Sequence, residues 1–342
     1  MYTPSFAMTA ELAMHETNAR GGVLGREVEL VPIRVGPHAL RQVDELTGAL
    51  ERAQADGIIV CHDSHVRELV IDSLQGRAPV FYPPIWEGGA QRRGVICTGE
   101  DSGSKIWPAI RWLAEHASAT DWMIVGTDYL WPSGTAIAVE PQLRAMGWWH
   151  GTHLVPYSLL DDLDGDERVV RQLVDAVDAS SASCVLVLLH GSQMAMFNRE
   201  FAVRGLDSRV LRFAPMADES VLLASGPETT QGLLTAFGSL RDGATVDGRD
   251  FLERYRALHG AIVPTPTGVT LAGYEGVAVA CAVVERTGHL RPSSDDLASM
   301  REQGFEFEAP TGRVTVRGDL VERPMNLLGV DGIELVHIAA LS

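Results

Sequence analysis

The stretch Gly57-Ile-Ile-Val-Cys61, followed at once by His62-Asp-Ser-His65, decides the fold of this chain. Its first part is an apolar run too short for a helix, and the periodic segment 66–74 comes directly after the polar residues. A short, continuous apolar run is typical of a strand that is buried on both faces, as in parallel sheets. The stretch therefore predicts a β-strand that passes directly into an α-helix.

The same alternation continues on both sides of this stretch. Helices are expected at 5–18, 40–54, 66–74, 107–116, 136–146, 169–179 and 194–202, and strands at 28–33, 57–61, 79–82, 94–97, 122–126, 152–157, 184–189 and 210–213. Strands that alternate with helices form parallel sheets covered on both faces. Because two such runs follow each other, we predict two doubly wound, Rossmann-like α/β lobes. Beyond residue 250 we expect three helices (251–258, 274–287, 295–302) and strands at 305–307, 313–316 and 333–338.

Composition narrows the function classes. The 342 residues include 28 basic and 45 acidic ones, which gives a formal net charge of −17 and disfavours binding to nucleic acids. No apolar run approaches the roughly 20 residues that span a bilayer. The first residues do not resemble a signal peptide, so we expect a cytoplasmic protein as given, and a periplasmic or extracellular lipoprotein if the N-terminus is trimmed. The four cysteines are widely spaced and are expected in the core.

Ligand sites of open parallel sheets form beyond the carboxyl ends of the strands. The junctions of this chain carry aromatic, hydroxyl and imidazole groups, and neither a Gly-rich dinucleotide loop nor a phosphate-binding P-loop occurs. Such groups favour a small-molecule pocket that binds its ligand without converting it, and we expect no cofactor and no metal. The hydroxyl of Ser64 and the helix start around it suit a carbonyl or carboxylate oxygen. The predicted ligand-binding residues are His62, Asp63, Ser64, Tyr82, Tyr129, Trp131, His190 and Met216.

The motifs at these junctions also carry a family resemblance. The segment Glu11–Leu30 resembles the opening helix, glycine turn and second strand of type I periplasmic binding proteins of the Leu/Ile/Val-binding group. Four further motifs resemble the branch of amide-sensing regulators and of urea or short-chain-amide binding proteins of ABC importers. They are Asp63-Ser-His-Val-Arg67, Tyr82-Pro with Trp86-Glu-Gly88, Gly126–Pro132, and Ala309–Val316.

The resemblance implies two lobes, joined by a three-strand hinge, that close on a ligand. Lobe I is expected to comprise residues 1–118 plus 243–319, and lobe II residues 119–242 plus 320–342. The implied ligand is a small amide-like or amino-acid-like solute. The implied partner is an ABC permease or a cytoplasmic regulator that senses the closed form, and a homodimer is an open alternative.

Individual residues carry over from the family pattern. The pocket serine of the family falls on Ser64, its stacking tyrosine on Tyr82, and its far-lobe aromatic pair on Tyr129 and Trp131.

Three positions depart from the family pattern. His62 replaces a tyrosine, Pro84-Ile85 replaces Thr-Pro, and Pro215-Met216 replaces paired threonines. The smaller number of hydroxyls favours a ligand that is larger or less polar than acetamide or urea.

The family begins with a strand at the centre of the first lobe's sheet, and this chain starts just after it, at Met1-Tyr-Thr-Pro4. An absent central strand leaves its neighbours without hydrogen-bond partners. We therefore expect that the start is trimmed or mis-assigned, or that another segment fills the gap.

Two other interpretations of the polar residues stay open. His62, Asp63 and His65, or His150 with His153, supply part of a metal site, but further ligands must converge on them. Ser64 with His62 or His190 supplies a nucleophile and a base, which would make the protein an enzyme evolved on the binding-protein scaffold.

Overall fold

The computed structural model describes residues 4–33, 43–156, 163–238 and 246–341, and it divides the chain into two compact units. The first unit comprises Tyr2–Glu100 and Arg241–Arg323, and the second unit comprises Asp101–Leu240 and Pro324–Ser342. The chain therefore passes between the units three times. This division and the alternating strands and helices confirm the predicted two-lobe α/β fold.

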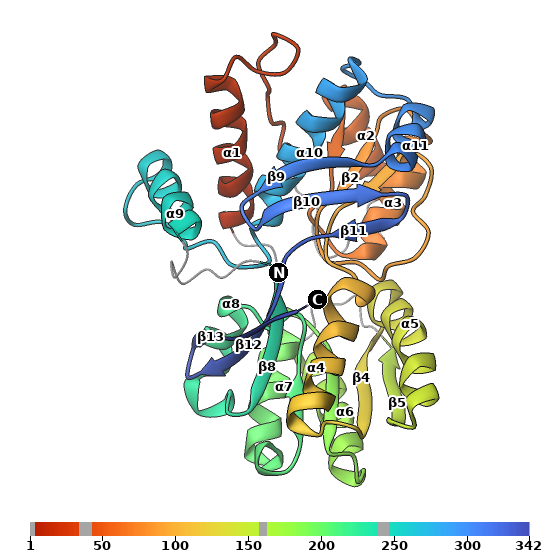
Figure 1. Ribbon diagram of the computed structural model, residues 1–342, viewed down its shortest axis with the longest axis vertical. Coiled ribbons are helices and arrows are strands. Elements are labelled where there is room, and N and C mark those ends of the chain that lie inside the picture. The colour runs from red at the N-terminus through yellow and green to blue at the C-terminus, as the bar shows by residue number, and fades with distance from the viewer. Residues whose placement is uncertain (1–3, 34–42, 157–162, 239–245, 342) are drawn as a thin grey trace. The chain divides into compact units, whose positions relative to one another are not determined.

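The first unit contains two three-stranded sheets (Figure 1). The parallel sheet has the order β1-β2-β3, formed by Ile58–Ile59, Val80–Tyr82 and Val95–Cys97. The antiparallel sheet has the order β11-β10-β9, formed by Leu320–Glu322, Gly312–Arg317 and Phe305–Ala309. The helices are α1 (Pro4–Ala19), α2 (Val43–Ala53), α3 (Ser64–Leu74), α9 (Val246–His259), α10 (Ala272–Thr287) and α11 (Ser294–Gln303).

Both faces of the parallel sheet are buried, as its continuous apolar strands predict. Val80 and Tyr82 belong to a cluster with Val66 and Val70 of α3. Phe81, between them in sequence, belongs instead to a cluster with residues of α10, α11 and the antiparallel sheet. Side chains that alternate along β2 thus pack against α3 on one face and α10 on the other.

The predicted strand at 28–33 is wrong. These residues form no ladder with any described strand, and Val31 is 52% exposed. The side chain of Asn18 instead binds the backbone of Val28 through two hydrogen bonds of 2.7 and 2.9 Å. An apolar run becomes a strand only beside a backbone that completes its ladder, and within the described strands β1 pairs with β2 alone.

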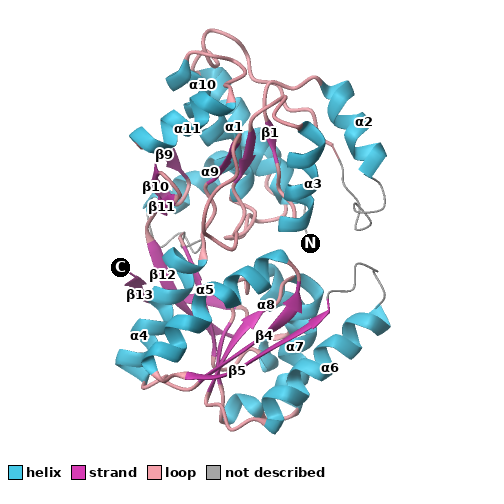
Figure 2. Cartoon of the chain, turned by 90° about the vertical axis from the view of Figure 1, so that its right-hand side faces the viewer, coloured by secondary structure: helices cyan, strands magenta, loops and turns pink. Residues whose placement is uncertain are grey.

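The second unit contains one seven-stranded sheet of order β13-β12-β8-β7-β6-β4-β5 (Figure 2). In chain order the strands are β4 (Trp122–Asp128), β5 (Trp149–Pro156), β6 (Cys184–Leu188), β7 (Leu211–Phe213), β8 (Leu233–Phe237), β12 (Met325–Asp331) and β13 (Glu334–Leu341). The helices are α4 (Trp107–Ala117), α5 (Leu130–Met146), α6 (Leu163–Ala179), α7 (Gly191–Val203) and α8 (Glu219–Ser225), with the one-turn segments η2 (Ser102–Ile106), η3 (Leu206–Ser208) and η4 (Pro227–Thr229).

Strands β4 to β8 run parallel, and β12 and β13 complete the sheet in antiparallel pairing. The main core of this unit joins Val125, Val185 and Val187 of the sheet to apolar residues of α6, α7 and α8. Within the described residues, no helix combines the length and the apolar character that a membrane span requires.

A buried arginine of the second unit forms hydrogen bonds with several surrounding groups. Arg212 of β7 has no solvent-exposed surface, and its guanidinium carbon lies 4.4 Å from the centre of the Phe201 ring. It donates hydrogen bonds to the side chain of Asn198 (2.9 Å) and to the carbonyls of Thr229 (3.0 Å) and Gln231 (2.8 Å). Burial lowers the pKa of Arg212 to about 10. The guanidinium thus donates to three acceptors, while its Nε atom has no partner among the described residues.

Replacing this arginine should destabilise the protein. We expect Arg212→Met to lower the free energy of unfolding by about 2 kcal/mol, because buried acceptors lose their donors. Urea denaturation measures the change. The matched control is Arg209→Met, which removes a half-exposed ion pair with Asp178 and should change the stability by less than about 0.5 kcal/mol. Equal losses in the two variants would show that the buried hydrogen bonds contribute nothing.

Candidate functional site

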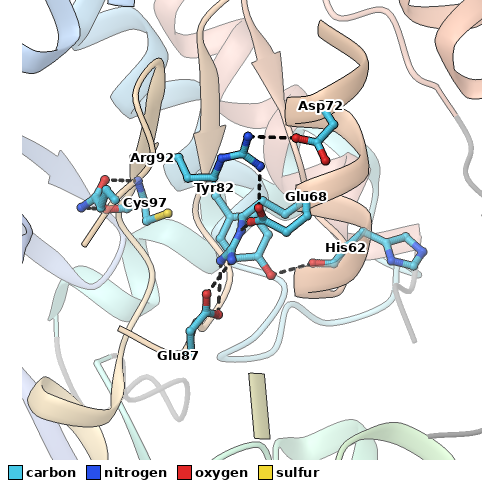
Figure 3. Close-up of polar contacts among 9 residues, drawn as sticks. His62, Glu68, Asp72, Tyr82, Glu87, Arg92 and Cys97 are labelled. Atoms are coloured by element: carbon cyan, nitrogen blue, oxygen red, sulfur yellow. Dashed lines mark hydrogen bonds and ion pairs between the residues drawn. The ribbon is translucent and has the colours of Figure 1, made fainter. Parts of the chain in front are cut away.

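Several predicted site residues of the first unit lie together at the carboxyl ends of β1 and β2, and Figure 3 shows two of them, His62 and Tyr82. We call this group the Ser64 cluster. It consists of His62, Asp63, Ser64, Arg67, Tyr82 and Glu87. The loop after β1 supplies the first two residues, the start of α3 the next two, and β2 with its following loop the last two.

Ser64 is the first residue of α3 and carries a polar atom without a partner. Its residue surface is 1% exposed, and its hydroxyl oxygen is buried with no hydrogen-bond partner among the residues that the structure describes. Asp63 occupies the N-cap position, yet its side chain makes no capping hydrogen bond. Because the first N–H groups of a helix have no partner within the helix, this end of α3 suits an oxygen acceptor.

A hydrogen bond from Tyr82 joins the end of β2 to the loop before α3. The Tyr82 hydroxyl donates a hydrogen bond of 2.9 Å to the carbonyl of His62, as Figure 3 shows. The guanidinium carbon of Arg67 lies 4.8 Å from the centre of its ring, within the range of a cation–π contact. Burial raises the pKa of Tyr82 well above 10, so its hydroxyl stays protonated.

Arg67 is a functional candidate that the sequence motifs did not assign. It binds both carboxylate oxygens of Glu87, at 2.6 and 3.3 Å, and one oxygen of Glu68 at 2.8 Å. Arg92 extends the network with hydrogen bonds to Glu68 (2.7 Å) and Asp72 (2.8 Å). The signal for Arg67 was its spacing, because residues three apart on a helix share a face and Ser64 is three residues before it.

His62 and His65 flank the start of α3. The Nδ1 atom of His62 accepts a hydrogen bond of 2.8 Å from the amide of Asp63, so this nitrogen is not the base of a Ser64 nucleophile. The two imidazole rings meet edge to face, 6.2 Å apart. Burial lowers the pKa of His65, which favours its neutral form.

In the second unit, predicted residues from two different strand ends lie together. Tyr129 follows β4 and precedes α5, whereas His190 follows β6 and precedes α7. The ring of Tyr129 lies 5.9 Å from that of His190 and 6.5 Å from that of Trp131. We call these residues the Trp131 cluster and include Thr127 and Gln193, which occupy the same two junctions.

Three buried polar atoms of the Trp131 cluster lack partners in the described part of the chain. They are the hydroxyl of Thr127, the indole nitrogen of Trp131 and the side-chain oxygen of Gln193. The nitrogen of Gln193 is already used, since it donates a 2.7 Å hydrogen bond to Asp166. Met216 is buried in the turn after β7, the strand beside β6. The Trp131 cluster therefore has one hydrogen-bond donor (the indole N–H of Trp131), one hydroxyl (Thr127) and one amide oxygen (Gln193), together with aromatic surface.

The described residues contain no group of three or more His, Cys, Asp or Glu side chains that could hold a metal ion. The chemistry that the two clusters offer is hydrogen bonding, through Ser64, Thr127 and Trp131, and contact with aromatic rings.

Comparison with known proteins identifies the family. The family model described as "periplasmic binding protein" matches residues 1–332. The comparison with curated proteins gives no match.

Solved structures share the fold at low sequence identity. A periplasmic binding protein from Burkholderia mallei is 14% identical, with a TM-score of 0.82 over 99% of this chain and 90% of that one. A solute-binding protein of an ABC transporter from R. palustris, in complex with 4-hydroxybenzoate, is 17% identical, with a TM-score of 0.79 over 99% and 92% of the two chains. The branched-chain amino acid transporter substrate-binding protein LivJ from Streptococcus pneumoniae, in complex with isoleucine, is 15% identical, with a TM-score of 0.71 over 98% and 93%.

The family match spans nearly the whole chain, and the fold has the two α/β units and three chain passages that the sequence motifs implied. The chain therefore belongs to the type I periplasmic binding proteins.

Proposed function

We propose that this protein is the solute-binding component of an ABC importer and that its solute is a small amide-like or amino-acid-like molecule. The observation that carries the proposal is the buried hydroxyl of Ser64 at the start of α3, which has no hydrogen-bond partner among the described residues. An oxygen of the solute would accept a hydrogen bond there.

The charge of the Ser64 cluster supports a solute without net negative charge, such as an amide or a zwitterionic amino acid, over an anion. Arg67 is the cluster's only arginine, and it is already paired with Glu87 and Glu68. Asp63 adds a further carboxylate to the cluster. An anionic solute would therefore be held by hydroxyl and helix-end groups beside negative charge, whereas an amide, or an amino acid whose ammonium group balances its carboxylate, makes the same hydrogen bonds without net repulsion.

The Trp131 cluster supports a solute with apolar surface. Its rings supply flat contact area, and Trp131 and Thr127 add a donor and a hydroxyl. The neighbouring structures carry isoleucine and 4-hydroxybenzoate, which are both small molecules with an apolar body and a polar end. We therefore expect a solute larger than urea or acetamide, such as a branched or aromatic amide.

A thermal-shift screen tests the class of solute. The panel contains acetamide, urea, benzamide, L-leucine and benzoate, and a ligand at 100 times its dissociation constant stabilises the protein by about 2.7 kcal/mol. We expect benzamide or L-leucine to raise the melting temperature more than benzoate does. A shift with benzoate alone would contradict the amide-like class.

Ser64→Ala should weaken the binding of the solute that the screen selects. We expect the dissociation constant to rise about tenfold, because a buried hydrogen bond to the solute is lost. Isothermal titration calorimetry measures the change. Ser73→Ala is the matched control, since Ser73 lies at the other end of α3, where its hydroxyl accepts a hydrogen bond from Thr47. Unchanged affinity in Ser64→Ala would remove the first-unit half of the proposal.

Trp131→Phe tests the second unit independently. The substitution keeps an aromatic ring and removes the unpartnered indole N–H, so we expect about a tenfold loss of affinity and little change in stability. Trp112→Phe is the control, because Trp112 stacks on His116 within α4, away from the strand ends. Equal affinities of Trp131→Phe and the wild type would show that the Trp131 cluster does not bind the solute.

The reactivity of the cysteine thiols tests the alternative that the protein is an enzyme with a cysteine nucleophile. Burial raises the pKa of Cys97 to about 12 and that of Cys281 to about 11, and it also raises the pKa of Cys61 and Cys184. Because the reactive form is the thiolate, we expect negligible reaction of the native protein with Ellman's reagent at pH 8 over minutes. All four cysteines should react after unfolding in urea. One fast-reacting thiol in the native state would favour an enzyme.

A further inference from the structure

The chain leaves the first unit through a short segment directly after β3. We call Thr98–Glu100 the exit segment, since the second unit begins at Asp101. Two hydrogen bonds join it to Trp86, a residue that is 2% exposed. The indole nitrogen of Trp86 donates to the carbonyl of Gly99 (3.1 Å), and its backbone amide donates to the carbonyl of Glu100 (3.0 Å).

The contact between the exit segment and the loop of Trp86 is tight. A Cβ atom at Gly99 would lie 1.7 Å from the carbonyl oxygen of Pro84 and 2.7 Å from that of Pro83. Only glycine fits this approach. The amide of Thr98 also donates to the carbonyl of Tyr82, at 3.0 Å. The exit segment is thus packed against the loop that follows Tyr82.

The same loop is joined to the Ser64 cluster on its other side. Glu87, the residue after Trp86, holds Arg67 through two hydrogen bonds, and Arg67 lies over the ring of Tyr82. Arg67 is one turn of α3 after Ser64. A continuous series of contacts therefore runs from the start of α3 through Arg67 and Glu87 to Trp86.

A buried ion pair fixes the exit segment at its start. Arg323, the last residue of the first unit, donates to the carbonyl of Thr98 and to the carboxylate of Glu275 of α10, both at 2.6 Å. Both charged side chains are almost fully buried. The start of the exit segment is thus held by Arg323 and by the carbonyl of Tyr82, whereas Trp86 binds the carbonyls of its last two residues, Gly99 and Glu100.

We propose that Trp86 is a positioning residue that couples the Ser64 cluster to the exit segment. The role of Trp86 in solute binding rests on the proposed function. The coupling itself needs no solute. A disturbance of Arg67 or Glu87 moves the Trp86 loop, and the carbonyls of Gly99 and Glu100 follow because they accept its hydrogen bonds.

A double-mutant cycle, read by hydrogen–deuterium exchange of the solute-free protein, tests the coupling. Arg67→Met should raise the exchange rate of the amides of Gly99 and Glu100 about fivefold to tenfold, since one buried hydrogen-bond network is released; the amide of Thr98 is left out because it donates directly to Tyr82. In the Trp86→Phe background, Arg67→Met should raise the exchange rate of these amides less than twofold. Glu87→Gln replaces Arg67→Met as the first substitution if that variant does not fold.

Trp122→Phe is the matched control background. Trp122 is also fully buried, and its indole nitrogen also donates to a backbone carbonyl, that of Ala119 (2.8 Å), but it lies in β4 of the second unit. Arg67→Met should keep its full effect there, and exchange in β4 itself should stay unchanged in Arg67→Met and Trp86→Phe.

Additive effects of Arg67→Met and Trp86→Phe would overturn the proposal, as would an unchanged exit segment in Arg67→Met. Because no solute is used, a failed solute screen leaves the result of the cycle intact. An additive cycle with intact solute binding would reject the role of Trp86 alone.

Discussion

Parallel pairing of the strands is the constraint on which both clusters depend, because it brings all carboxyl ends to one edge of a sheet. In the second unit, Gly126 of β4 stands opposite Leu188 of β6, so the residues that follow the two strands begin at the same level. Tyr129 and His190 meet for this reason, although 61 residues separate them in sequence. In the first unit, the pairing of Ile58 with Val80 brings Ser64 and Tyr82 into one cluster in the same way.

The buried polar atoms divide into two classes with different meanings. Arg212 is fully buried and donates three hydrogen bonds through its two terminal nitrogens, which leaves only its Nε atom without a partner among the described residues. The hydroxyls of Ser64 and Thr127 are as deeply buried but have no partner among the described residues, at a cost of about 1–3 kcal/mol each. Other hydroxyls share this state, such as those of Thr135 within α5 and Thr235 within β8. Ser64 and Thr127 differ from these two because they lie near the carboxyl ends of strands, and this position supports the proposal that they bind a solute.

The sequence predicted what is decided locally. Most strands and helices, and the residues at their junctions, were expected because each depends on a continuous run or a helical period. The strand at 28–33 was wrong because a strand also needs a neighbour, which periodicity does not report. Strands β8 and β12 were missed because Thr235 and Gly329 interrupt their apolar runs. The pairing of Arg67 with Glu87 was missed because it joins residues twenty positions apart.

The placement of Arg67 explains why the Ser64 cluster is rigid without being cationic. Its charge is neutralised by two carboxylates, and its flat guanidinium covers the ring of Tyr82. The hydroxyl of Tyr82 is held by His62, so the loop before α3 has little freedom to rearrange. A preorganised site loses less entropy when a ligand binds. Under the proposed function, selectivity would depend on the Ser64 hydroxyl and the start of α3, which can bind an oxygen acceptor without requiring it to carry charge.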